Sequence, residues 1–482
     1  MRKIYYIIIT FIGFGLQSCN LLDIKPVNSM LPVSVEDYES VLLGGYPRQE
    51  FFMRTDLGTD NVYANLNCGR EADRNLVPWY IWADATQLAD QEDTYWMQLY
   101  QSIFYCNTVL DEFESRTPAP EEEELFETVR GEAYALRAYC YFYLVNLYAD
   151  VYSEENLNKP GVPMPLSAED VHEFTQNNVR EPIGDVYEQI NRDLDAATAD
   201  LQGKQAKSLY RFGYTSLQAL KARVYLFMGR YEDAINAASD VISSKSLFDM
   251  NNLQSIIDEE GEQYAFSGNS GFIDTDYRNE VLFFVGGNAI NNIFYYSTNM
   301  FKPSEELLAL CNRDPNTTDY RKYIFSSFAD LTTAEGIQTG PTVYYMFAQQ
   351  EKQCYYIGFK LSEAYVIRAE CYTRLNQLGN AVADLNDLLV NRIKSDGFVA
   401  LNEADFTQET LLQRVLEERR VELAFDGGLR WFDLRRLGKP AQTHVYENGQ
   451  VYNLRQGDPR YILQIPESEQ VNSPDIELNP RD

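Results

Sequence analysis

Histidine, basic side chains and paired cysteines are scarce in this chain of 482 residues. It contains two histidines, His172 and His444, and 41 Lys and Arg against 72 Asp and Glu, which gives a net charge of −31. Such an acidic surface repels a phosphate backbone, so the sequence argues against nucleic acid as a partner. The cysteines and histidines also lack the CxxC and HxxxH spacings of zinc sites and of Cys/His nucleophiles, so neither is predicted.

Signatures of the common enzyme classes are missing as well. The chain has no GxSxG, HExxH, P-loop or Rossmann fingerprint. A pair of carboxylates spaced for glycoside hydrolysis is the enzymatic alternative, but among 72 acidic residues such a pair has no specificity. Asp274 and Asp276 resemble half of a calcium loop without its glycine and closing glutamate. We therefore predict that the chain is not an enzyme and carries no metal or cofactor.

Long hydrophobic runs are absent beyond the first residues. Arg2 and Lys3 precede an apolar stretch over residues 4–16, and Gly15 and Ser18 are small residues of the kind found near cleavage sites. As a helix this stretch rises about 20 Å, which is less than the roughly 30 Å hydrocarbon core of a bilayer. The pattern predicts a secretory signal peptide rather than a transmembrane anchor.

The signal ends in Leu16-Gln17-Ser18-Cys19, which resembles a bacterial lipobox. The resemblance implies that residues 1–18 are removed as a lipoprotein signal peptide and that Cys19 carries a diacylglyceryl group and an acylated amino terminus. Two or three acyl chains hold a protein stably on a bilayer, at about 0.8 kcal/mol for each buried CH₂. The alternative is a secreted protein in which Cys19 is incidental.

The remainder of the chain has the composition of one large folded unit. Residues 19–40 contain scattered proline and no helical period until their end, which predicts a lipidated tether, and residues 41–482 are expected to form a single domain. With 45% hydrophobic residues this domain can bury a large core. The other six cysteines are either free and buried or joined in three disulfides, and the sequence leaves both possibilities open.

A helical pattern occurs twice in the domain. Residues 221–242 and 368–389 share small and aromatic residues at helical spacing, then a short break at Gly229 or Asn376, then a second amphipathic helix. The alanines allow paired helices to approach closely. This arrangement resembles tetratricopeptide-type repeats.

Two further segments extend the pattern. Residues 135–151 repeat the first helix, with residues 183–201 as its partner, and residues 94–113 form another amphipathic helix. Helical pairs of this kind stack, because one pair alone cannot bury its apolar face. We predict a mostly α protein, a tetratricopeptide-like helical repeat scaffold with long irregular loop insertions.

The irregular segments between the helices are where we expect binding residues, because long ordered loops in compact proteins are usually functional. Three aromatic residues within four positions, in a segment without helical period, would be unusual as pure core, although for any one of them a position in the core is the favoured alternative. Trp96 is excluded because its neighbours have helical spacing, which predicts that it packs inside. The candidate ligand contacts are Asn61, Tyr63, Asn65, Trp79, Tyr80, Trp82, Tyr295 and Tyr296. Replacing Trp82 with alanine is expected to weaken binding and to leave stability nearly unchanged.

Residues 415–437 read VLEERRVELAFDGGLRWFDLRRL. They resemble the C-terminal signature of the SusD/RagB family of outer-membrane nutrient-binding lipoproteins, and the likeness extends along most of the chain after Cys19. Residues 472–474 and Glu477 depart mildly from the family pattern. Alternating Glu and Arg, followed by Trp and Phe between Arg and Asp, predict buried ion pairs that lock this helix to the repeats, so the motif is interpreted as scaffold.

The resemblance implies a lipid-anchored protein of the outer membrane that faces the cell exterior. Such a protein captures a nutrient, usually an oligosaccharide, and delivers it to a SusC-like TonB-dependent transporter. Tyr and Trp side chains in the loops would present aromatic faces to sugar rings. Two alternatives stay open: a SusD-like protein that binds peptide, and a helical repeat scaffold that binds only protein. The identity of the ligand is not given by the sequence.

Overall fold

The computed structural model describes most of the chain after residue 31. The described residues are 32–47, 53–66, 71–83, 94–173, 179–261, 265, 280–285, 300–325, 330–332, 338–341 and 358–481. The predicted lipidation site Cys19 and the candidate ligand contacts Tyr295 and Tyr296 lie outside these residues, and so do Asp274 and Asp276.

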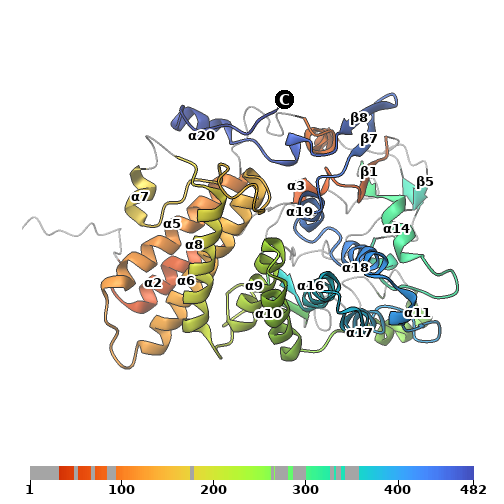
Figure 1. The fold of residues 1–482 in the computed structure, drawn as a ribbon, viewed down its shortest axis with the longest axis horizontal. Helices are drawn as coiled ribbons and strands as arrows, with labels where there is room; N and C mark the ends of the chain where they lie inside the picture. Colours follow the sequence, from red (N-terminus) through yellow and green to blue (C-terminus); the bar gives the residue numbers. More distant parts are fainter. Residues whose placement is uncertain are drawn as a thin grey trace, which may run out of the picture.

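Long helices form the body of the molecule (Figure 1). They are α2 (Val35–Gly45), α5 (Thr94–Ser115), α6 (Glu123–Tyr148), α8 (Ile183–Leu201), α9 (Tyr214–Met228), α10 (Tyr231–Ser244), α16 (Leu361–Arg374), α17 (Leu378–Leu389) and α18 (Gln408–Glu422). Helix α6 packs on α5 and α8, α9 packs on α10, and α16 packs on α10, α17 and α18. The predicted scaffold of stacked helical pairs is therefore confirmed.

The two repeated hairpins turn in the same way. The predicted breaks at Gly229 and Asn376 both have a left-handed backbone, with φ angles of 72° and 58°. Such a conformation is usual where a helix ends, and glycine or asparagine tolerates it best. Ala222 and Ala369 are fully buried where the helices meet. The sequence repeat thus corresponds to a structural repeat.

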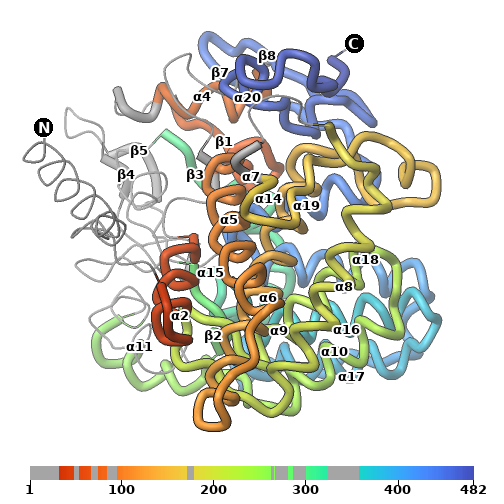
Figure 2. Tube along the Cα trace, turned by 90° about the vertical axis from the view of Figure 1, so that its left-hand side faces the viewer, coloured from red at the N-terminus to blue at the C-terminus, as the bar shows by residue number. Residues whose placement is uncertain are grey.

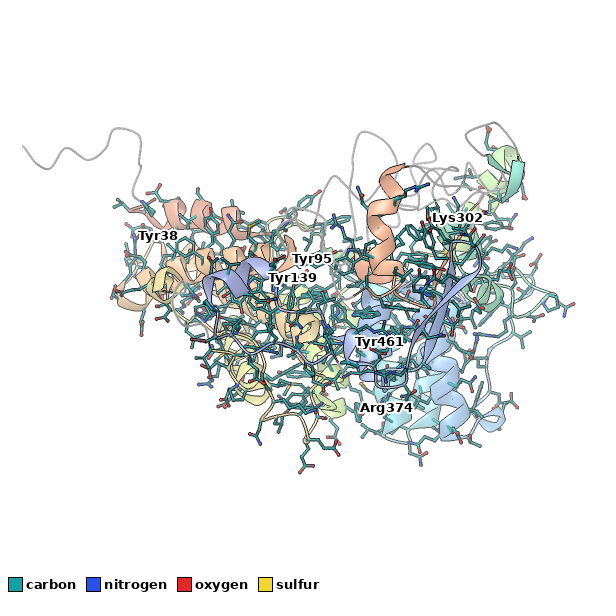
Figure 3. All side chains as sticks on the ribbon, turned by 90° about the horizontal axis from the view of Figure 1, so that it is seen from above. Tyr38, Tyr95, Tyr139, Lys302, Arg374 and Tyr461 are labelled. Atoms are coloured by element: carbon teal, nitrogen blue, oxygen red, sulfur yellow. The ribbon has the colours of Figure 1, made fainter. Side chains whose placement is uncertain are left out.

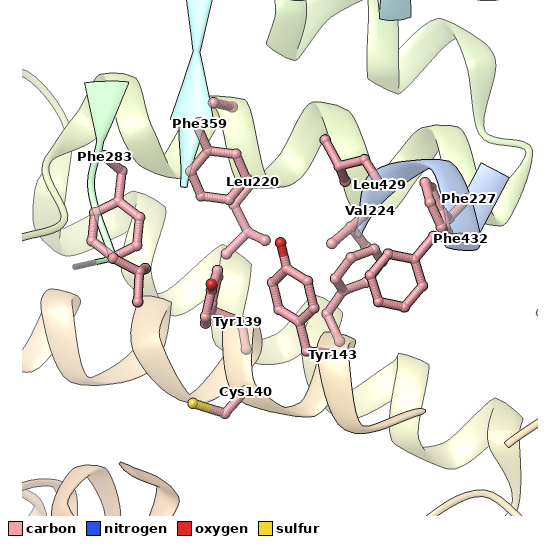
Figure 4. Packing of buried hydrophobic residues seen from close by; sticks show 14 of the residues in the cluster. Tyr139, Cys140, Tyr143, Leu220, Val224, Phe227, Phe283, Phe359, Leu429 and Phe432 are labelled. Atoms are coloured by element: carbon pink, nitrogen blue, oxygen red, sulfur yellow. The ribbon is translucent and has the colours of Figure 1, made fainter. Parts of the chain in front are cut away.

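Aromatic side chains fill the centre of the helical stack. Tyr139 and Tyr143 of α6 point toward α9, and Phe283 and Phe359 approach from two short strands (Figure 4). The Tyr139 and Tyr143 rings are 4.5 Å apart, and Phe283 and Phe359 lie 5.9 and 6.2 Å from Tyr139. The Tyr139–Tyr143 contact is tilted and the other two are edge-on, and contacts between aromatic rings at such distances are favourable.

Short strands and helices connect and cover the stack. The strand pairs are β1 (Val62–Ala64) with β3 (Phe301–Pro303), β2 (Val281–Phe283) with β6 (Phe359–Lys360), β4 (Asp330–Thr332) with β5 (Gln338–Pro341), and β7 (Gln442–Tyr446) with β8 (Gln450–Leu454), all antiparallel. The short helices are α3 (Met53–Asp56), α4 (Val77–Tyr80), α7 (Ala168–Glu173), α11 (Gln254–Glu260), α14 (Glu305–Cys311), α15 (Lys322–Phe325), α19 (Leu429–Arg436) and α20 (Glu467–Asn472). Figure 2 shows α4, β7 and β8 together at one edge, near the C-terminus.

Buried ion pairs hold the 415–437 segment, as predicted. Arg419 of α18 bonds Asp433 of α19 at 2.8 Å, and Glu422 lies 3.1 Å from Arg392. Burial alone would raise the pKa of Glu422, but Arg392, Lys360 and Arg321 outweigh it and lower the pKa to about 2. The carboxylate is therefore ionised in the core, where its partners compensate its charge.

Four of the six remaining cysteines fall in the described part of the chain. Cys106, Cys140, Cys311 and Cys371 are buried and carry free thiols. Cys68 and Cys354 lie outside it. Across the same residues, none of the helices combines the length and the apolar character needed to span a bilayer.

Candidate functional site

An open groove of about 750 Å³ lies where β1, β7, α14 and α19 meet. Its lining residues are Asp60, Val62, Tyr63, Ala64, Tyr80, Ser304, Glu305, Glu306, Arg420, Arg430, Leu434, Pro440, Ala441, Gln442, Thr443, His444 and Val445. Figure 1 shows β1, β7 and α19 in the same part of the molecule, above α18. Seen from above, Lys302 of β3 and Tyr461 lie on the half of the molecule away from Tyr38 (Figure 3). The groove volume is in the range of small-molecule sites.

Strand β1 forms one wall of the groove. Its pairing with β3 is fixed by two backbone hydrogen bonds, from Asn65 N–H to the Met300 carbonyl at 2.8 Å and from Ser304 N–H to the Asn61 carbonyl at 2.7 Å. Side chains alternate along a strand, so Val62 is buried while Tyr63 is 39% exposed. Tyr63 thus presents an aromatic face at the groove.

Two arginines on one carboxylate form the charged part of the groove. Arg430 bonds both carboxylate oxygens of Asp60, at 2.8 and 2.7 Å, while Arg420 bonds the Asp60 carbonyl and the Asn61 amide oxygen, each at 2.7 Å. Burial raises the pKa of Asp60, but the hydrogen bonds and charges of Arg430 and Arg420 outweigh it, so the pKa lies below its ordinary value. Asp60 is therefore ionised and held in position.

A stack of three rings forms the floor. His444 of β7 lies between Tyr80 and Trp82, with ring centroids 4.2 and 4.1 Å apart. The Tyr80 hydroxyl accepts from Ala64 N–H of β1 at 3.1 Å and donates to the Val445 carbonyl of β7 at 3.4 Å. The hydroxyl thus bridges the facing edges of two strands that do not pair with each other.

A second, smaller cavity of about 30 Å³ lies next to this stack. It is lined by the three indoles of Trp79, Trp82 and Trp431, together with Gly58, Thr55, Ala83, Arg460, Arg481 and residues 462–464. Trp82 donates from Nε1 to the Gly58 carbonyl at 2.9 Å, whereas the Nε1–H of Trp431 is buried without a hydrogen-bond partner. The volume suits about two water-sized groups.

The structure brings most of the described candidate residues to these two cavities. Tyr63 and Tyr80 line the groove, and Trp79 and Trp82 line the small cavity. Asn61 is fully buried behind the groove, where Arg420 bonds it, and Asn65 is half-buried at the end of β1. Their role as ligand contacts stays a prediction.

One expectation about the aromatic cluster is wrong. Trp79, Tyr80 and Trp82 are core residues, 8%, 2% and 4% exposed. Trp79 and Tyr80 lie in the short helix α4, and Tyr80 also packs 5.3 Å from Phe301. A one-turn helix is too short to show a period in sequence, which is why the segment was interpreted as irregular. Trp96 is buried, as predicted.

Sequence reasoning missed the arginines of the groove. Arg420 and Arg430 belong to the 415–437 segment, which was interpreted as scaffold alone. Several of its other charged residues pair within the segment, as Arg419 does with Asp433, or with nearby helical elements, as Glu422 does with Arg392. Arg420 and Arg430 instead reach Asp60, about 360 residues away in sequence, at the groove. The sequence gives no signal that separates these two arginines from the rest, because the segment contains five arginines and five acidic residues.

Comparisons with known proteins agree with this fold along the chain. Residues 22–226 match the sequence model of a SusD-like family described as starch-binding and associating with the outer membrane. Residues 291–481 match the model of the SusD family. The chain belongs to the SusD/RagB family.

Individual SusD relatives are similar over nearly their whole length. SusD-like protein P38 of Formosa agariphila is 24% identical, with 93% of this chain and 95% of the relative covered, and SusD-like protein P2 of the same organism is 23% identical with 99% of each covered. A solved putative sugar-binding protein of Bacteroides vulgatus has a TM-score of 0.73 at 20% identity, covering 94% of this chain and 99% of its own. A SusD superfamily protein of Bacteroides thetaiotaomicron has a TM-score of 0.72 at 24% identity, covering 93% and 100%.

Membership fixes the broad class of the protein. SusD family proteins are carbohydrate-binding proteins that associate with the outer membrane and work with its transporters. The family is one of binding proteins rather than enzymes. Among the described residues, no group of three or more His, Cys, Asp or Glu residues is placed to hold a metal ion.

Proposed function

We propose that this chain is a cell-surface lipoprotein that binds a glycan in the groove between β1, β7, α14 and α19 and delivers it to a SusC-like TonB-dependent transporter. Lipid on Cys19 would hold the protein on the outer membrane after removal of residues 1–18. The proposal on Cys19 is supported by the lipobox-like sequence before it.

The observation that carries the proposal is the composition of the groove. Sugar rings bind through aromatic faces and through hydrogen bonds to fixed polar groups. Tyr63 supplies an exposed ring, and Asp60, Arg420 and Arg430 supply donors and acceptors whose positions are already fixed by their mutual bonds. Thr443 and Gln442 of β7 add polar atoms on the facing wall. Positions fixed before binding reduce the entropy lost when the ligand binds.

The test is binding of acyl-free protein, residues 20–482, to a broad panel of soluble polysaccharides and peptides by calorimetry. We expect at least one polysaccharide to bind and the same sample to leave it uncleaved. Binding of peptides alone would favour the peptide alternative. Tight association with the transporter without any small ligand would favour a protein-binding scaffold, and turnover of an oligosaccharide would contradict the non-enzymatic assignment.

Anchoring is tested separately in cells. Cys19→Ser should release the protein from the membrane fraction into the soluble fraction, because the variant cannot carry the acyl chains proposed to hold it on the bilayer. Radiolabelled palmitate should be incorporated into the wild-type chain and not into the variant. Equal membrane association of both proteins would contradict lipidation at Cys19.

A further inference from the structure

His444 occupies an enclosed position directly under the groove. The residue is 5% exposed, and its ring lies nearly parallel to those of Tyr80 and Trp82, at interplanar angles of 14° and 25°. On one side is the groove, which His444 and Tyr80 line, and on the other is the small cavity that Trp82 lines. The imidazole therefore has no freedom to turn without disturbing the floor.

Both nitrogens of His444 face oxygens that can only accept. Nδ1 lies 2.6 Å from the Tyr80 carbonyl oxygen, and Nε2 lies 3.1 Å from the Thr59 carbonyl oxygen. A neutral imidazole has one N–H, whereas an imidazolium has two. In the neutral ring a nitrogen lone pair therefore faces a carbonyl oxygen, and only a second proton converts both contacts into hydrogen bonds.

The two carbonyls belong to different segments of the site. Tyr80 is in α4, and Thr59 directly precedes Asp60, the carboxylate that holds Arg420 and Arg430. A bond from His444 to Thr59 thus ties β7 to the segment that positions the charged part of the groove. The bond to Tyr80 ties β7 to the aromatic floor.

The charges around the ring come from other elements, because helix α4 (Val-Pro-Trp-Tyr) and strands β7 and β8 carry no other charged side chain. Asp60 is the charge that acts on the pKa of His444. The groove is also lined by Arg420, Arg430, Glu305 and Glu306, and the small cavity by Arg460. Asp56 of α3 accepts hydrogen bonds from Thr59 at its backbone carbonyl. Asp56 is itself fully buried, and burial raises its pKa well above the ordinary value, which favours its neutral form. Burial lowers the pKa of His444, while the two carbonyls and the Asp60 charge raise it, and the net shift is downward. The ring therefore gains its second proton on the acid side of about pH 6.5.

We propose that His444 is a proton-operated clasp beneath the groove: on protonation it bonds Thr59 as well as Tyr80, fixes the Asp60 segment and strengthens ligand binding. The effect on ligand binding rests on the proposed function, whereas the clasp itself is a property of the free protein. His444 acts as a positioning residue, because its ring is buried beneath the residues that would meet the ligand.

The clasp is tested without ligand. The chain has two histidines, so ¹³C-histidine labelling gives two ring signals, which His444→Gln and His172→Gln assign. Hydrogen exchange of peptides covering residues 58–64, corrected for the intrinsic rate, is then followed from about pH 7.5 to about pH 5. We expect protection in the wild type and in His172→Gln to rise about fivefold, the effect of one added hydrogen bond. Glutamine cannot gain a second donor bond on acidification, so His444→Gln should show no rise.

Two results would overturn the clasp. One is that the His444 signal does not titrate in this range. The other is that protection changes with pH equally in His444→Gln and in the wild type. The effect of the clasp on ligand binding is measured as the affinity for the polysaccharide that binds best in the panel. This affinity should rise at acid pH in the wild type and stay constant with pH in His444→Gln. If no polysaccharide binds, the proposed function fails, while the exchange experiment still decides the clasp.

Discussion

The helical stack and the cavity region of this protein differ in how completely their polar groups are paired. In α6, α8, α9 and α10, which the structure describes throughout, no buried side-chain nitrogen or oxygen lacks a hydrogen-bond partner. Around the cavities, buried polar atoms of Asp56, Asn61, Trp431 and Gln442 lack one. Unpaired buried groups cost stability, so natural proteins retain them mainly where function requires them. Helices α6, α8, α9 and α10 therefore lose no stability in this way, whereas the cavity region does. Elsewhere in the stack, the Ser362 hydroxyl of α16 is also unpaired.

The strongest test of this contrast is to remove a fully paired charge from the stack. Arg223 of α9 bonds both oxygens of Glu363 of α16, at 2.8 and 2.6 Å, and its side chain is 1% exposed. Arg223→Met leaves the Glu363 carboxylate buried with a more distant cation, Arg419 at 3.9 Å, so the free energy of unfolding should fall by about 3–5 kcal/mol. Urea unfolding measures the change. The matched control is Arg230→Met, whose half-exposed pair with Asp233 should contribute less than about 1 kcal/mol.

Truncating a tryptophan in each region should give losses of different size. Trp96 of α5 packs between Tyr100 and Tyr148, whereas Trp82 has the small cavity on one side. Because Trp82 already lacks some neighbours, we expect Trp82→Ala to lower the unfolding free energy by about 3 kcal/mol and Trp96→Ala by about 5 kcal/mol. This replaces the expectation from the sequence that Trp82→Ala leaves stability unchanged. Equal losses would contradict looser packing around the cavity.

Two carboxyl groups that lie close together in sequence should change the stability of the protein in opposite directions as the pH falls. Glu422, with a pKa of about 2, stabilises the folded state fully above its unfolded pKa of about 4.5 and loses this effect as the pH falls toward 2. Asp426, next to the cavity region, has a pKa raised to about 6, first by burial, so its contribution is present below its unfolded pKa and lost as the pH rises through 6.

These opposite signs predict the pH profile of stability. Glu422→Gln should flatten the decline between about pH 4.5 and about pH 2, and Asp426→Asn should flatten the decline between about pH 4 and about pH 6. Thermal unfolding across this range, measured for both variants and the wild type, gives the slopes. A wild-type slope that persists in Glu422→Gln would show that another group carries the acid response.

The same contrast explains what could be predicted from the sequence. Stack residues such as Ala222 and Ala369 follow a helical period, so the residues next to them in sequence are enough to predict that they face the core. The cavities depend on pairs distant in sequence, such as His444 with Thr59 and Arg430 with Asp60. No period links such residues. Tyr63 was a candidate because aromatic side chains in loops are a compositional signal, whereas nothing in the sequence distinguishes Arg430 from the other arginines of residues 415–437.

The substitution expected to change stability least, Tyr63→Ala, is also the most selective test of ligand binding. Tyr63 on β1 and Tyr210 in the stack region have similar exposure, 39% and 43%, but only Tyr63 lines the groove. Each Tyr→Ala substitution should change the unfolding free energy by about 0.5 kcal/mol or less, as is usual for surface positions. Tyr63→Ala should nevertheless weaken binding of the best polysaccharide in the panel about tenfold by loss of aromatic stacking, and Tyr210→Ala should leave it unchanged. Calorimetric titration of both variants decides the matter, because equal affinities would place the sugar elsewhere on the protein.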